Sequence, residues 1–169
     1  LMSGRVSINS IRPVRIEALL GRETVKIEDD HVATLLAGKR LLVTGAGGSI
    51  GSELCRQLAR FNPAAVVLVE SSEYALYRIE QWFKTYYPEL HTIPLAGDVK
   101  DRTRMETIFH NWNPHIIYHA TAFKHVPLME VDNAWEAVRN NALGTLVVAQ
   151  CAQQVKAERF ILISTDKAV

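Results

Sequence analysis

The stretch Lys39-Arg-Leu-Leu-Val-Thr-Gly-Ala-Gly-Gly-Ser-Ile-Gly51 decides the fold, because a short apolar run breaks into glycines and then restarts with helical spacing. The apolar run Leu41–Val43 predicts a buried strand. Gly45 permits a tight turn, Gly48 lets the main chain approach a ligand without an intervening Cβ atom, and Gly51 lets the next helix pack closely. The first amide groups of that helix are then available to an anion.

The sequence around the loop favours a dinucleotide as the ligand over an ordinary glycine turn. Apolar residues follow at helical spacing, which predicts one buried helix face (Ile50, Leu54, Leu58 and Phe61). A second apolar run, residues 64–69, then leads into Glu70. This carboxylate follows the last loop glycine by about twenty residues, the distance expected for an acidic group that binds the adenosine ribose.

The competing interpretation, an ATPase phosphate loop, is disfavoured by the residues after the glycines. Such loops need a Lys and then Ser or Thr directly after the last glycine, whereas Gly51 is followed by Ser52 and Glu53. The spacing Gly-x-x-Gly-x-x-Gly, with Gly47 as an additional glycine, does depart from the commonest dinucleotide fingerprint. The strand before the loop and the helix after it outweigh that departure.

Helices and strands alternate along the rest of the chain. Ser72 is positioned to begin a helix that ends before Pro88. The later elements are expected at residues 91–95 (strand), 102–112 (helix), 115–120 (strand), 134–155 (helix) and 159–164 (strand). This alternation predicts an α/β fold with a parallel, doubly wound (Rossmann-type) sheet that breaks off after about its fifth strand.

In such a sheet, ligands bind outside the carboxyl ends of the strands. Five separate segments lie at or just past these ends and are expected to converge on one crevice: 44–51, 70–72, 98–99, 119–125 and 164–167.

Length and composition indicate one soluble globular domain. The 169 residues are 48% hydrophobic with a net charge of +1, which allows a substantial core and gives no reason to expect a nucleic-acid partner. No apolar run approaches the roughly 20 residues that cross a bilayer, and the first residues lack a secretory pattern. We therefore expect no membrane contact by this segment, and we expect Cys55 and Cys151 to be buried thiols in a reducing cytoplasm.

Residues 1–38 do not fit the alternation, so we divide the chain into an N-terminal extension (1–38) and a dinucleotide-binding domain (39–169). Within the extension, residues 16–20 and 31–37 have the pattern of short helices. The extension packs either on the domain or on a second subunit, which leaves a homo-oligomer open, or it is a partly ordered linker.

A metal site is not expected. The histidines that could form one are spread over a helix, a strand and a loop with no matching Cys or carboxylate pattern (His110, His115, His119 and His125).

Five stretches also carry a resemblance to a known family. They are Thr44–Gly51, Gly97–Val99, His119–Glu130, Asn140–Thr145 and Ser164–Val169. Together they resemble the polysaccharide-biosynthesis nucleotide-sugar 4,6-dehydratases, a branch of the extended short-chain dehydrogenase/reductase superfamily. The resemblance extends back to about residue 11, because Ile16–Arg22 is similar to the connector that precedes the catalytic domain in membrane-anchored members. It implies that this chain is a soluble, cytoplasmic piece of a membrane-anchored bacterial parent.

The resemblance also implies a reaction on a UDP-N-acetylhexosamine, with UDP-N-acetylglucosamine as the first choice. Hydride leaves C4 for the nicotinamide, water is lost across C5 and C6, and hydride returns to C6. By carry-over, Thr165 bonds the C4 oxygen, Asp166 is the acid toward the C6 hydroxyl, and Lys167 is the C5 base. These acid and base roles need shifted pKa values. Without the resemblance, Asp166 as a helix cap and a solvated Lys167 would be the simpler interpretation.

The superfamily's Tyr-x-x-x-Lys pair, or its variant with Met in place of Tyr, is absent from the chain, since no Tyr has a Lys four residues later. The resemblance would locate it beyond Val169. We therefore expect the 169 residues to bind the dinucleotide weakly or not at all, and to have no dehydratase activity.

The cofactor is expected to be NAD rather than NADP. Glu70 would bind a ribose diol and repel a 2′-phosphate, and its neighbours Ser71 and Ser72 supply no positive charge. The resemblance adds Asp98 and Val99 at the adenine, backbone of Ala120 and Ala122 at the ribose and pyrophosphate, Asn141 at the active-site side of the sheet, and Lys124 near the nicotinamide or sugar. The expected cofactor-binding residues are Gly45, Gly47, Gly48, Ser49, Ile50, Gly51, Glu70, Ser72, Asp98, Val99, Ala120, Ala122, Lys124 and Asn141.

Two alternatives stay open. The parent could be a nucleotide-sugar epimerase or reductase, although C4 epimerisation needs no acid for a C6 hydroxyl and so makes less use of Asp166. The chain could also be a non-catalytic dinucleotide-binding module in which the first 38 residues mediate assembly.

Overall fold

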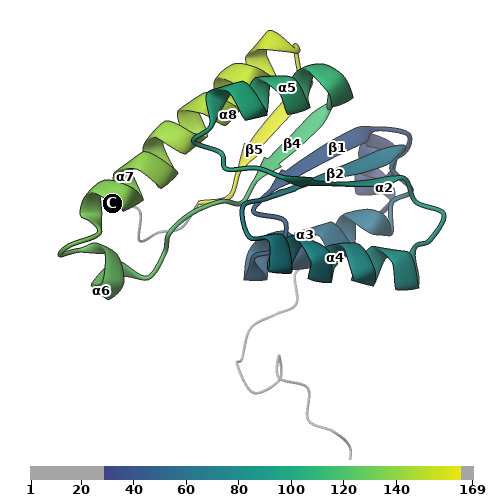
Figure 1. Ribbon diagram of the computed structural model, residues 1–169. Coiled ribbons are helices and arrows are strands. Elements are labelled where there is room, and N and C mark those ends of the chain that lie inside the picture. Colours follow the sequence, from purple (N-terminus) through teal and green to yellow (C-terminus); the bar gives the residue numbers. More distant parts are fainter. Residues whose placement is uncertain (1–28, 165–169) are drawn as a thin grey trace, which may run out of the picture.

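The computed structural model describes residues 29–164 and is built around a five-stranded sheet (Figure 1). The strands are β1 (Arg40–Thr44), β2 (Ala65–Glu70), β3 (Thr92–Ala96), β4 (Ile116–His119) and β5 (Arg159–Leu162). Their order is β3-β2-β1-β4-β5, and every neighbouring pair is parallel. The predicted parallel, doubly wound sheet is therefore confirmed.

Helices cover both faces of the sheet (Figure 1). The helices α2 (Asp29–Leu36), α3 (Ser49–Ala59) and α4 (Glu73–Tyr86) share a core with one face, and α5 (Arg102–Trp112) and α8 (Gly144–Gln154) share a core with the other. Neighbouring strand residues point to opposite faces, so Leu42 joins the second core while Leu41 and Val43 join the first. Burial on both faces explains why the inner strands β1 and β2 contain continuous apolar runs.

Local capping chemistry sets two helix starts close to their predicted positions. The Ser72 hydroxyl accepts a hydrogen bond from the Ala75 amide at 3.3 Å, and this confirms Ser72 as the N-cap of α4. Asp101 caps α5 in the same way through the Arg104 amide at 3.0 Å. At the other end of α5, Asn113 adopts a left-handed conformation with φ of 43°, which ends the helix.

The expected long helix over residues 134–155 is interrupted. It consists of α7 (Ala134–Val138), a π-helical turn η2 (Arg139–Leu143) and α8. The short helix α6 (Val126–Met129), which begins with a proline in its first turn, was not predicted. Sequence periodicity cannot distinguish a π-helical turn from a continuous helix, because one inserted residue shifts the apolar pattern only slightly.

The buried face of α3 also differs from the prediction. Ile50 is 50% exposed, whereas the residues that turn inward are Gly51, Cys55, Leu58 and Ala59. The close contact between Gly51 and the glycine loop fixes the rotation of the helix, and this rotation turns Ile50 away from the sheet. Leu54 and Phe61 lie partly buried at the edge of the core.

The helix α2, which leads into β1, packs on the domain through Leu36. Leu36 is 1% exposed and belongs to the core that α3 and α4 share, and the Gly38 amide donates to the Asn62 carbonyl at 3.2 Å. The expected helical segment at residues 16–20 lies outside the described residues. The division at residue 38 therefore stays a prediction.

Both cysteines are buried and free, as predicted. Burial raises the pKa of the Cys55 thiol to about 12, so Cys55 is not a reactive thiolate at neutral pH.

The turn between β1 and α3 has no room for a side chain at Gly51. A Cβ atom there would overlap the carbonyl oxygen of Gly45. Gly45 has a positive φ of 65°, and a Cβ at Gly45 would lie 2.9 Å from the carbonyl oxygen of Ala120. Because both positions are glycine, the backbone of α3 at its N-terminus can lie directly against the end of β1.

A chain of buried and partly buried hydrogen bonds joins the ends of β1 and β4 to α8. The Thr44 hydroxyl lies 2.6 Å from Nδ1 of His119, and Nε2 of His119 lies 2.9 Å from the Thr145 hydroxyl. Because Thr145 donates its own proton to the Asn141 carbonyl at 2.6 Å, it must accept from Nε2. His119 is therefore protonated on Nε2 and accepts from Thr44 through Nδ1. Burial lowers its pKa to about 4, so it is neutral near pH 7.

Gly51→Ala is expected to destabilise the fold by roughly 2 kcal/mol or more, because the new methyl group must displace backbone rather than a flexible side chain. Gly48→Ala is the matched control in the same loop, since its Cβ would lie 3.2 Å from the Gly45 carbonyl oxygen. The control should cost less than about 1 kcal/mol. Urea denaturation of the two variants checks this, and equal losses would contradict the proposed packing constraint.

Stability is expected to fall as the pH drops from about 6.5 to about 4, because unfolded His119 gains a proton that the folded protein excludes. His119 should account for about 2 kcal/mol of the loss between pH 7 and pH 5. The unfolding free energies of the wild type and of His119→Gln should be measured across this pH range. Their difference separates the contribution of His119 from that of the carboxylates, which titrate in both proteins. The variant should give the flatter curve, and parallel curves would show that His119 does not cause the dependence.

Candidate dinucleotide site

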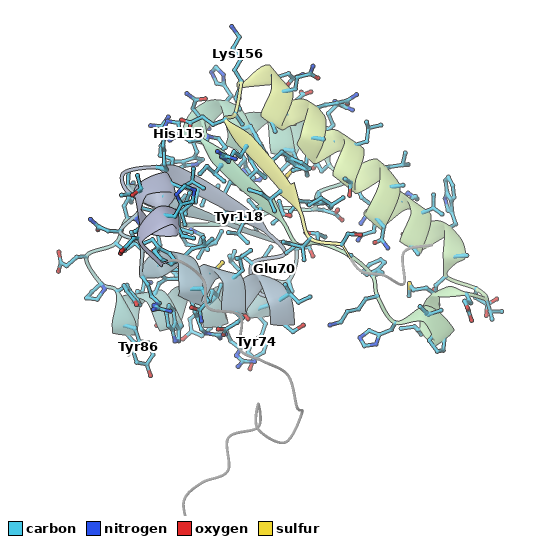
Figure 2. The ribbon with its side chains drawn as sticks, turned by 180° about the vertical axis from the view of Figure 1, so that it is seen from behind. Glu70, Tyr74, Tyr86, His115, Tyr118 and Lys156 are labelled. Atoms are coloured by element: carbon cyan, nitrogen blue, oxygen red, sulfur yellow. The ribbon has the colours of Figure 1, made fainter. Side chains whose placement is uncertain are left out.

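The candidate site lies where the strand order reverses. β2 and β3 extend from one side of β1, and β4 and β5 extend from the other, so the connections leave β1 and β4 in opposite directions. Figure 2 shows Glu70 at the carboxyl end of the sheet, with His115 toward the opposite end. A crevice forms at such a reversal, at the carboxyl ends of the strands, and the predicted site segments that the structure describes lie at these ends.

The glycine loop is held by backbone hydrogen bonds. The Ala46 amide donates to the Val69 carbonyl at 3.2 Å, and the Gly48 amide donates to the Gly45 carbonyl at 3.0 Å. Gly48 is the N-cap of α3, and within the described part of the chain no side chain caps this helix start. The amides of residues 49–51, at the positive end of the helix dipole, are therefore the groups that an anion would meet.

Glu70 faces the loop, as its spacing suggested. Its Oε2 atom accepts from the Gly47 amide at 3.0 Å, and Oε1 accepts from the Ser72 amide at 3.0 Å and the Ser71 hydroxyl at 3.3 Å. These bonds fix the direction of the carboxylate, while each oxygen keeps capacity for a further donor such as a ribose hydroxyl.

A pocket opens between the glycine loop and the ends of β2 and β3. Its volume is about 230 Å³, including the part open to solvent, and it is lined by Gly45, Val69, Glu70, Ser71, Gly97, Asp98, Val99, Thr121 and Asn140. The predicted residues Gly45, Glu70, Asp98 and Val99 meet in this pocket. Thr121 and Asn140 were missed, although both lie in the stretches that carry the family resemblance, and residues 119–125 also satisfy the strand-end rule.

Asp98 and Val99 enter the pocket differently. Partial burial would raise the pKa of Asp98, but hydrogen bonds from the side chain and amide of Lys100, with the charges of Lys100 and Arg139, hold it below its usual value. Asp98 is therefore an anion paired with Lys100 at 2.8 Å. Val99 is 3% exposed and packs against Gly144. A Cβ atom added to Gly144 would lie 2.7 Å from Cγ2 of Val99. The side chain of Val99 is thus largely committed to the core.

The loop after β4 borders the other side of the glycine loop. Lys124 donates through Nζ to the Ser49 hydroxyl at 3.2 Å, which brings a positive charge to the start of α3. The Asn141 side chain accepts from the Phe123 amide at 2.8 Å and donates to the Phe123 carbonyl at 3.0 Å. Asn141 therefore clamps the loop that contains Ala122, which is exposed, and Lys124.

The three predicted catalytic residues, Thr165, Asp166 and Lys167, lie outside the described residues. The strand that leads toward them, β5, ends at Leu162, and the next amide, of Ile163, donates to the His119 carbonyl at 2.9 Å. This bond directs the chain toward the carboxyl end of β4. The roles of these three residues stay predictions.

Residues 29–164 contain no group of three His, Cys, Asp or Glu side chains that could hold a metal ion. Within the same range, no helix is both long and apolar enough to span a membrane.

Comparison with known proteins agrees with this architecture. Residues 41–169 match the family model described as polysaccharide biosynthesis protein. The capsular polysaccharide biosynthesis protein CapD of Staphylococcus aureus is 44% identical over 170 residues, which cover 100% of this chain and 28% of CapD. This chain therefore spans little more than a quarter of that relative.

Two solved structures share the fold. The X-ray structure of Pen from Bacillus thuringiensis has a TM-score of 0.71 and 26% identity, covering 79% of this chain and 41% of Pen. The UDP-glucose-4-epimerase of Stenotrophomonas maltophila, solved with NAD and formylated UDP-arabinopyranose, has a TM-score of 0.65 and 22% identity. That match covers 76% of this chain and 38% of the epimerase. The family match over most of the chain, together with the fold, establishes that the chain belongs to the polysaccharide biosynthesis protein family.

Proposed function

We propose that this chain is the NAD-binding part of a UDP-N-acetylhexosamine 4,6-dehydratase that makes sugars for a surface polysaccharide. The observation that carries the proposal is the glycine turn at the head of α3, with the Glu70 carboxylate fixed against the Gly47 amide at 3.0 Å. The family membership supports a role in polysaccharide synthesis. The NAD and UDP-sugar bound to the Stenotrophomonas epimerase support the same pair of ligands here.

The residues present fit a dinucleotide on two counts. Side chains are sterically excluded at Gly45 and Gly51, so backbone amides can approach a pyrophosphate directly. The pocket beside the loop also contains a buried hydroxyl, that of Thr121, which has no protein partner among the described residues. Both features are suited to a ligand with many acceptor oxygens.

In this assignment each part of the crevice binds one part of the cofactor. The first amides of α3 bind the pyrophosphate, Glu70 binds the adenosine ribose, and Asp98 borders the adenine. Lys124 adds a positive charge over Ser49, on the side that leads to the nicotinamide. A nicotinamide dinucleotide held by these residues would supply the hydride acceptor for oxidation at C4 of the sugar and the hydride donor for reduction at C6.

The sugar chemistry is assigned to Thr165, Asp166 and Lys167. Thr165 bonds the C4 oxygen, Lys167 removes the C5 proton, and Asp166 protonates the departing C6 hydroxyl. C4 oxidation makes the C5 proton acidic, so one base and one acid are sufficient for the elimination.

Glu70→Ala in the full-length protein is expected to weaken NAD binding about 10-fold and to reduce the preference for NAD over NADP, because the ribose loses a charged acceptor. Isothermal titration with both dinucleotides measures this. Glu73→Ala is the matched control, since Glu73 is an exposed carboxylate in the first turn of the next helix, and it should bind like the wild type. An unchanged preference in Glu70→Ala would remove Glu70 as the discriminating residue.

The full-length protein is expected to convert UDP-N-acetylglucosamine to a product lighter by one water. In deuterated water, Asp166→Asn should still exchange the C5 proton but lose most of the dehydration, whereas Lys167→Met should lose both. Mass spectrometry and proton NMR of the sugar separate these outcomes. A wild-type product of unchanged mass would favour the epimerase alternative.

The 169 residues alone are expected to give no product in the same assay, because they contain no Tyr with a Lys four residues later. Turnover by the purified chain would contradict this.

A further inference from the structure

The Thr121 side chain is exceptional among the described residues. Its Oγ1 atom is buried and, within residues 29–164, is the one such side-chain oxygen or nitrogen without a hydrogen-bond partner. The protein gives a hydroxyl in this state no hydrogen bond to replace its hydration, which lowers the stability of the folded chain. Such an atom in a pocket wall therefore indicates that a ligand supplies the missing bond.

The position of the hydroxyl supports that interpretation. Thr121 lines the same pocket as Gly45, Glu70, Asp98 and Asn140, and its Oγ1 lies 3.0 Å from the point where a Cβ on Gly45 would lie. Because Gly45 lacks that Cβ, the hydroxyl can approach the turn of the glycine loop.

The polar groups around the pocket already have partners within the protein. Glu70 accepts from the amides of Gly47 and Ser72, and Asp98 accepts from the amide of Lys100 at 2.9 Å. The side-chain amide of Asn140 donates to Asn141 at 3.0 Å. These bonds direct the nearby polar groups to other atoms and leave the hydroxyl available to a bound molecule.

The lining residues decide which part of the ligand is involved. Glu70 and Asp98 come from the ends of β2 and β3, the side assigned to adenosine, and they line the pocket together with Thr121. Lys124, from the same loop as Thr121, instead contacts Ser49 at the start of α3, outside this pocket lining. The side chains that flank Thr121 are those of Ala120 and Ala122, which offer no hydroxyl.

We propose that the Thr121 hydroxyl binds an oxygen of the adenosine half of the dinucleotide, either a ribose hydroxyl or the adjacent phosphate. The proposal rests on the proposed function, because it assumes that this pocket receives a dinucleotide. Thr121 then contributes to affinity through a bond that exists only in the complex. Removal of the hydroxyl should therefore weaken the complex without destabilising the ligand-free protein.

The test compares Thr121→Ala with Thr121→Ser in the full-length protein. Thr121→Ala should weaken binding of NAD and of ADP-ribose by the same factor, about 3- to 10-fold, while the thermal midpoint without ligand stays equal or rises. Thr121→Ser keeps the hydroxyl and should bind like the wild type. Thr107→Ala, which removes an exposed hydroxyl bonded to the Thr103 carbonyl on α5, controls for the loss of a threonine.

Titrations with AMP and adenosine identify the oxygen. If Thr121→Ala binds both AMP and adenosine more weakly than the wild type does, the hydroxyl binds the ribose. If its affinity falls for AMP alone, the hydroxyl binds the phosphate.

Three results would overturn the inference. Wild-type affinity of Thr121→Ala for NAD and ADP-ribose would show that the hydroxyl makes no ligand bond. A fall in the ligand-free midpoint well beyond that of Thr107→Ala would show that the hydroxyl has a structural partner instead. If wild-type protein binds none of these ligands, the proposed function itself fails and the inference fails with it.

Discussion

The contact between Gly51 and the carbonyl of Gly45 is the constraint on which the rest of the site depends. It brings the first turn of α3 directly against the end of β1, so that unpaired helix amides face the crevice. It also sets the rotation of α3, which buries Cys55 and Leu58 and leaves Ile50 half exposed. One steric requirement therefore determines both the packing of the helix and the direction of its anion-binding end.

The buried chain through His119 supports the other side of this crevice. It links Thr44, the residue before the glycine loop, to Thr145 at the start of α8, and through the Asn141 carbonyl to the π-helical turn. The side chain of Asn141 then holds both backbone groups of Phe123. The neutral imidazole takes part in two hydrogen bonds, and it thus connects the loop expected to bind the pyrophosphate with the loop that contains Phe123 and Lys124.

The sheet was predictable because its signals are local. Continuous apolar runs bounded by glycine, proline or polar residues identify buried parallel strands, and Ser72 and Asp101 are hydrogen-bonding caps beside apolar-periodic segments. The convergence of Gly45, Glu70 and Asp98 followed from one topological rule, that strand ends meet at the same edge.

What could not be predicted depends on packing between distant segments. The exposed side chain of Ile50 results from a backbone contact, and the π-helical turn at residues 139–143 leaves no distinct periodicity. The unpaired hydroxyl of Thr121 appears only when the hydrogen bonds of every neighbouring group are known, since its sequence context resembles any strand end.

A crystal structure of the full-length protein with NAD is the decisive experiment for this site. The pyrophosphate should lie against the amides of residues 49–51, with the adenosine ribose beside Glu70. A dinucleotide bound elsewhere, or bound with its phosphates away from the start of α3, would contradict this assignment.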